Sequence, residues 1–168
     1  TRPLDRNDIF LLVNVLEVTG KSYSNQTGKF LTPSSTGNNY VLVLYEYDSN
    51  SIHGVPIKNR TASEIKRAYT SMIELLKSCG LTPKLQILDN ETSSTILLKY
   101  IDNEGINYQL VPPSIHHRNA AERAISTYKD HLIAGLSSTD KVFPLHLWDK
   151  LIPQANFTNL AGCLQGHE

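Results

Sequence analysis

The run from Tyr40 to Tyr47 reads Tyr-Val-Leu-Val-Leu-Tyr-Glu-Tyr, and only Glu46 interrupts its apolar and aromatic side chains. Aromatic and β-branched residues favour strands. A continuous apolar run of this length, without polar alternation, is typical of a strand that is buried on both faces. The run therefore predicts a central strand of a sheet, with other elements packed on either side of it.

Other segments of β type lie on both sides of this run, and a helical pattern follows them. We expect a first strand at about Gln26–Phe30 and a third at Ile52–Ile57, so that the first three strands form sequential hairpins. The period then changes, because Thr61 to Glu64 fits a capping box and apolar residues follow it at helical spacing. Gly80 is expected to end this helix.

Strands and helices alternate through the second half of the chain. We expect strands at Pro83–Leu88 and Ile106–Val111, and helices that begin at Ser93 or Ser94, run from about Asn119 to Ile133 before Gly135, and begin again at Pro144, with Pro153 kinking or ending the last one. The order β-β-β-α-β-α-β-α-α predicts an α/β fold with a five-stranded mixed sheet. Three antiparallel strands precede two α/β units, and helices cover both faces, which is the ribonuclease H-like architecture.

Length and charge narrow the classes of function. The 168 residues suit one domain with a real core, and 16 basic residues balance 16 acidic ones. This balance argues against a strongly basic nucleic-acid-binding surface, although it allows a local basic strip.

The apolar segment Ile9–Leu16 is too short to span a membrane, so a buried strand is the preferred interpretation and no membrane partner is expected. Cys79 and Cys163 form no C-x-x-C motif, which favours free thiols in a reducing, intracellular compartment.

Two carboxylates occupy positions where α/β proteins place ligands. Asp89 closes an apolar strand, and Glu122 stands near the start of the helix that follows the next strand. Each residue alone has an ordinary structural interpretation, Asp89 as a turn residue and Glu122 as a helix-start acid. Together they suggest a centre for Mg²⁺ or Mn²⁺, since these ions prefer hard oxygen ligands and act in pairs in phosphoryl transfer. A third carboxylate is expected on an earlier strand, but the chain has Asn25 there.

An ordered set of segments resembles the integrase core of LTR retrotransposons, of the copia-like type found in microbial eukaryotes. The segments are Tyr23–Phe30, Gly37–Asn50, Leu88–Glu91, Leu110–Pro113, His116–Ala124, Pro144–Trp148 and Leu151–Gln154. The resemblance covers about residues 22–160 as one catalytic-core domain. It leaves residues 1–21 as a divergent N-terminal lead-in and residues 161–168 as a divergent C-terminal tail.

The resemblance implies a triad of two aspartates and a glutamate that binds Mg²⁺ or Mn²⁺. Carried over, Asp89 and Glu122 are the metal-binding acids, and Asn25 stands at the position of the first acid. The implied reactions are 3′-end processing and strand transfer, with element ends and target DNA as partners. The resemblance also implies a homo-oligomer that acts in the nucleus. Because Asn25 is neutral, we expect this activity to be severely reduced or absent.

The resemblance also implies contacts with DNA around the start of the Glu122 helix. The residues concerned are His117, Arg118, Asn119, Ser126 and Lys129. His117 and Arg118 fall in the expected loop before the helix, and Asn119 is a candidate helix cap. Ser126 and Lys129 share the helix face of Glu122. Ordinary alternatives are a solvated polar loop and a surface lysine. Trp148 is expected in the core or at a subunit contact.

Two other functions fit the same pattern. A non-catalytic nucleic-acid-binding or assembly protein would keep the fold and lack turnover, which agrees with Asn25. A related ribonuclease H-like nuclease would share the strand order, but the His116–Ala124 segment favours the integrase interpretation.

Overall fold

The computed structural model describes residues 20–89, 93–111 and 118–159, and it contains one five-stranded sheet in the order β3-β2-β1-β4-β5. The strands are β1 (Lys21–Gln26), β2 (Tyr40–Glu46), β3 (Ser51–Ile57), β4 (Leu85–Asp89) and β5 (Asn107–Val111). β1, β2 and β3 pair antiparallel, whereas β4 runs parallel to β1 and to β5. The mixed sheet and the α/β class are therefore as the sequence predicts, with β2 as an interior strand.

One face of the sheet is covered by α2 (Ala62–Ser78) and α3 (Thr95–Asn103). The apolar stripe of α2 packs on alternate residues of β2, among them Leu42 and Leu44, which are fully buried. Leu97 and Ile101 of α3 extend this core toward β4. The helical spacing of the apolar residues in the sequence is the cause of this layer.

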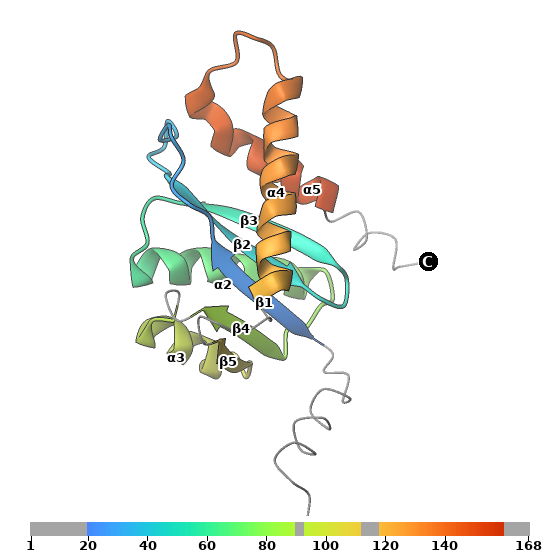
Figure 1. Cartoon of the computed structure of the whole chain (residues 1–168). Helices are drawn as coiled ribbons and strands as arrows, with labels where there is room; N and C mark the ends of the chain where they lie inside the picture. The colour runs from blue at the N-terminus through green and yellow to red at the C-terminus, as the bar shows by residue number, and fades with distance from the viewer. Residues whose placement is uncertain (1–19, 90–92, 112–117, 160–168) are drawn as a thin grey trace, which may run out of the picture.

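The opposite face is covered by α4 (Arg118–Ser138), the 3₁₀ helix η1 (Leu145–Leu151) and α5 (Ile152–Asn159). Figure 1 shows α4 lying across this face, with α2 on the other side of the sheet. Trp148 is buried here, stacks on Phe30 with ring centroids 4.2 Å apart, and donates from Nε1 to the carbonyl oxygen of Thr32. Its predicted place in the core is confirmed.

The first strand is not where the sequence predicted it. β1 is Lys21–Gln26, and residues 27–30 form the segment that leaves it. The polar residues Ser22 and Ser24 hid this strand, because they are buried and bonded to a neighbouring strand rather than exposed. The apolar segment Ile9–Leu16 lies outside the described residues.

Local signals were wrong at two helix ends and right at a third. Thr61 is the N-cap of α2, but its hydroxyl donates to Asn59 Oδ1 and makes no capping bond, so the capping box does not form. α4 continues through Gly135 to Ser138, because Leu136 still packs on the core. The helix that follows Pro144 does end next to Pro153, as predicted: η1 stops at Leu151, and Pro153 lies in the first turn of α5, where a proline needs no hydrogen-bonded N–H.

The position of α4 on the sheet is fixed by one close contact. The ring of Tyr128, in the middle of α4, lies over Gly54 of β3, where any β-carbon would stand 2.3 Å from the ring. Asn156 of α5 completes this contact, since its side chain bonds both the N–H and the carbonyl oxygen of Gly54 at 2.8 Å. No helix among the described residues is long and apolar enough to cross a membrane.

Candidate active site

The two strands that carry Asn25 and Asp89 are neighbours and run in the same direction. The register pairs Ser24 of β1 with Leu88 of β4, so the next residue on each strand, Asn25 and Asp89, lies at the same level. Adjacent strands are about 4.8 Å apart. The structure therefore brings the backbone positions of the first and second candidate site residues together, at the carboxyl ends of both strands.

Asn25 belongs to the face of β1 that α4 covers. Ser22 and Ser24 point to the α2 side, where they meet Gln86, and strand alternation places Tyr23 and Asn25 on the other side. The Asn25 side chain is half-buried, and its Oδ1 accepts a hydrogen bond from the backbone N–H of Gln26 at 2.8 Å. Position 25 thus presents a neutral amide that is already bonded to its own backbone.

Glu122 reaches this face from α4. Ala124, Tyr128 and Leu132 form the buried side of the helix and pack on β2 and β3, while the Glu122 side chain is exposed. The start of α4 lies close to the middle of the sheet, since Ala124 packs in the same core as Val41 and Val43 of β2. Burial is the main cause that raises the pKa of Tyr45, and Arg123 opposes it.

Helix α4 begins earlier than the sequence indicated. Its first residue is Arg118, so Glu122 lies just beyond the first turn, where the helix dipole adds little. Arg118 and Asn119 are inside the helix, which corrects the predictions of a loop residue and a helix cap. His117 lies outside the described residues.

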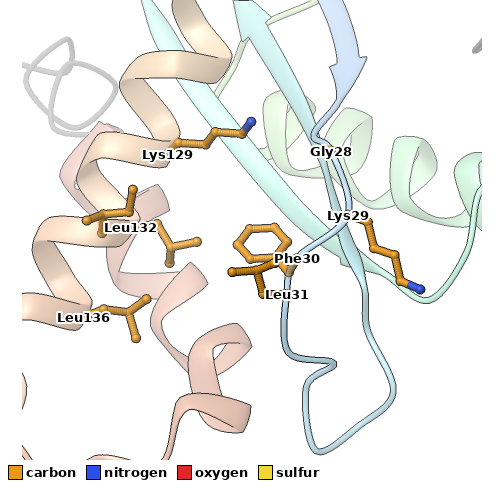
Figure 2. Close-up of a pocket in the computed structure, with 8 residues that line it drawn as sticks. Gly28, Lys29, Phe30, Leu31, Lys129, Leu132 and Leu136 are labelled. Atoms are coloured by element: carbon orange, nitrogen blue, oxygen red, sulfur yellow. The ribbon is translucent and has the colours of Figure 1, made fainter.

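Ser126 and Lys129 continue from Glu122 along one side of α4. Ser126 is exposed, and Lys129 is half-buried beside the segment that follows β1. Figure 2 shows the Lys129 side chain extending toward the chain at Gly28. Seven helical residues span about 10 Å along the helix axis. This side of α4 therefore extends about 10 Å from Glu122 to Lys129, which lies beside the segment that follows β1.

Comparisons with known proteins identify the fold. No protein-family model matches the chain, and no curated protein matches it in sequence. Among solved structures, the integrase catalytic core of HTLV-2, in complex with magnesium, superposes with a TM-score of 0.63 at 18% identity, over 83% of this chain and 84% of that one.

Two further structures agree. The catalytic core of BIV integrase has a TM-score of 0.63 at 16% identity, over 83% of this chain and 82% of that one. In the simian T-cell lymphotropic virus intasome the TM-score is 0.67 at 18% identity, and the match covers 83% of this chain but 48% of the viral one. The chain has the ribonuclease H-like fold of integrase catalytic cores.

The donor atoms in this integrase-core fold do not suit a pair of metal ions. Asp89 and Glu122 would supply two carboxylates, and Asn25 would supply one uncharged oxygen that is already shared with Gln26. Such a set has the chemistry to bind one hard cation. It lacks the charge and the bridging carboxylate that would hold two.

A buried polar cluster, which the sequence did not predict, supports the site from the α2 side. Gln86 of β4 is fully buried, accepts hydrogen bonds from Ser22 at 2.6 Å and Tyr69 at 2.9 Å, and donates to Ser24 at 2.9 Å. Burial raises the pKa of Tyr69 well above its usual range. The cluster locks β1 to β4 in the register that makes Asn25 and Asp89 neighbours. A lone glutamine between Leu85 and Ile87 was the signal for it in the sequence.

Proposed function

We propose that this chain is the catalytic-core domain of an LTR-retrotransposon integrase of the copia-like type, from a microbial eukaryote. In this proposal Asn25 has removed most of the metal-dependent activity. One observation carries it: β1 and β4 bring Asn25 level with Asp89, on the sheet that α4 crosses with Glu122. Its partners are element ends and target DNA, it acts in the nucleus, and it was made as part of a polyprotein.

The residues present account for the expected loss of activity. An amide in place of a carboxylate removes one negative charge and one metal-bridging oxygen from the site. Asp89 and Glu122 would still hold a single Mg²⁺ or Mn²⁺, but a displacement that depends on two ions has no support from this donor set. Ser126 and Lys129 keep their place beside Glu122, so DNA contacts on this side of α4 do not require the missing acid.

Strand transfer with Mn²⁺ tests the proposal. The chain and its Asn25→Asp variant are compared on a short duplex that mimics an element end, together with an Asn25→Asp/Glu122→Gln double variant. We expect Asn25→Asp to raise the rate on the order of 10²–10³-fold, the scale on which one preorganised polar group contributes to catalysis. The double variant should return to the baseline. If all three proteins fold and bind DNA but remain equally inactive, the triad assignment is wrong.

A non-catalytic DNA-binding or assembly role is the second candidate, and the bond from Gln26 N–H to Asn25 Oδ1 favours it. This role predicts salt-dependent binding without turnover, even with aspartate at position 25. The Lys129→Gln variant should reduce the salt slope by about one phosphate contact. A ribonuclease H-like nuclease would instead cut the duplex without joining ends, and the same assay separates these outcomes.

A further inference from the structure

An apolar groove of about 250 Å³ lies between the segment that follows β1 and the second half of α4. Phe30 and Leu31 form one wall, and Leu132 and Leu136 form the other (Figure 2). Ile133 of α4 also lines the groove. Phe30 and Leu132 are also part of the core beneath, so the floor of the groove is fixed.

The rims of the groove expose large apolar side chains to solvent. Leu31 is 103% exposed and Ile133 is 59% exposed, although they belong to opposite walls of the same groove. Adjacent exposed apolar side chains on a surface mark a contact site more often than isolated ones do. The groove is therefore suited to an apolar segment of chain.

The groove also carries two positive charges, which a bound segment should complement. Lys29 and Lys129 are among its lining residues, one from each wall, and no carboxylate is among the residues that line it. Figure 2 shows Lys129 extending toward Gly28, whereas the side chain of Lys29 is directed away from α4. Within the described residues neither lysine forms an ion pair. A segment that combines apolar side chains with flanking acids would complement both the apolar walls and the two lysines.

The chain itself contains a segment of this chemistry. Ile9–Leu16 is apolar except for Asn14, and it is flanked by Asp8 on one side and Glu17 on the other. Seven apolar side chains in eight residues need burial. The segment is therefore apolar like the groove walls, and its flanking acids are opposite in charge to the two lysines.

The length of chain between this segment and β1 decides whether the segment can come from the same molecule or must come from a second copy. Gly20 precedes β1, whereas Phe30 lies beyond its far end, because Phe30 N–H still bonds Asn39 on the neighbouring strand. Ten residues of extended chain separate them by about 30 Å. The four residues from Leu16 to Gly20 span at most about 14 Å, so the Leu16 end of the segment cannot reach the groove of its own chain.

We propose that the groove between residues 28–31 and α4 binds the Ile9–Leu16 segment of a second copy of this chain. Asp8 and Glu17 then lie beside Lys29 and Lys129 of the partner. This assignment does not depend on the proposed function. Single-stranded DNA could also use the two lysines, but an apolar wall on each side favours a peptide segment.

The oligomeric state of the full chain tests this assignment. Sedimentation equilibrium over a range of concentrations should show self-association, and Leu31→Asp should weaken it at least tenfold. Leu12→Asp in the segment should weaken it equally. Val142→Asp is the matched control, because Val142 is 84% exposed but lies outside the groove, and it should leave association unchanged. Circular dichroism of each variant confirms that it is folded.

Charge exchange gives a sharper test. A Lys29→Glu/Lys129→Glu copy and an Asp8→Lys/Glu17→Lys copy should each associate weakly alone, whereas an equimolar mixture should form a heterodimer. A monomer at all concentrations would overturn the proposal, and so would self-association that ignores both sets of changes. If Leu31→Asp instead weakens oligonucleotide binding and leaves association intact, the groove is a nucleic-acid site and the proposal is wrong.

Discussion

Replacement of Gly54 by alanine should strain the contact between α4 and the sheet and so destabilise the fold. A β-carbon at this position would stand 2.3 Å from Tyr128 Cζ and 2.4 Å from its hydroxyl oxygen. The tyrosine has no room to retreat, because it is fully buried and its hydroxyl donates to Asn156 Oδ1 at 3.0 Å. Asn156 is in turn held by the backbone of Gly54, so one added methyl group strains three elements.

The cost follows from two effects. Overpacking of a well-packed contact costs about 1–3 kcal/mol, and loss of the Tyr128–Asn156 hydrogen bond adds about 1 kcal/mol. We therefore expect Gly54→Ala to lower the free energy of unfolding by about 2–4 kcal/mol. Tyr128→Leu should also destabilise the protein, by leaving a cavity. In the double variant the methyl group fills part of that cavity, so the two costs should fall short of additivity by about 1–3 kcal/mol.

Urea denaturation followed by far-UV circular dichroism measures these free energies. Gly135→Ala is the matched control, since Gly135 is helical and a β-carbon there would meet no atom within 4 Å. It should stabilise the chain by about 0.5–1 kcal/mol through helix propensity. A Gly54→Ala variant within 0.5 kcal/mol of the parent, or full additivity in the double variant, would show that Tyr128 does not hold α4 as argued.

Two further predictions concern buried polar groups. Burial lowers the pKa of His53 to about 4 from an ordinary 6.5, so the unfolded chain binds the extra proton first as the pH falls. The free energy of unfolding should drop by up to about 3 kcal/mol between pH 6.5 and pH 4, and His53→Gln should flatten this dependence in urea titrations at both pH values. Gln86→Leu should cost about 2–4 kcal/mol, because it leaves Ser22, Ser24 and Tyr69 with fewer partners. Gln109→Leu, on an exposed position of β5, should change stability by less than about 0.5 kcal/mol in the same titration.

The elements that the sequence predicted well are those with a strong local signal. β2 is a continuous apolar run, and α2 carries six buried residues at helical spacing. β1 was placed wrongly because its stability is not local. Its serines are buried because Gln86 of the neighbouring strand bonds both of them, and Tyr69 of α2 bonds Gln86 in turn. A pattern of apolar residues cannot reveal a strand whose buried face is polar.

In the candidate site, too, the features with a local sequence signal were predicted and those that depend on strand pairing were not. Asp89 lies at the end of its strand and Glu122 lies in its helix, since strand ends and helical spacing are local features. The side-by-side placement of Asn25 and Asp89 depends on the pairing of β1 with β4. Arg118 and Asn119 were assigned to a loop and a cap because polar residues before an apolar stripe resemble a helix start.

Asn25 has a consequence for stability as well as for catalysis. Two carboxylates on adjacent strands about 4.8 Å apart would repel by about 1–3 kcal/mol in a partly solvated site. Asn25→Asp should therefore destabilise the metal-free chain by this amount, because position 89 lies level with it. Mn²⁺ should restore the stability of that variant and should stabilise it more than the parent, which keeps two of the three carboxylates. In buffer with a chelator the variant should stay less stable than the parent. Thermal unfolding with and without Mn²⁺ measures both effects without any need for turnover. An Asn25→Asp variant as stable as the parent in chelator, and unaffected by Mn²⁺, would mean that residues 25 and 89 do not face a common ion.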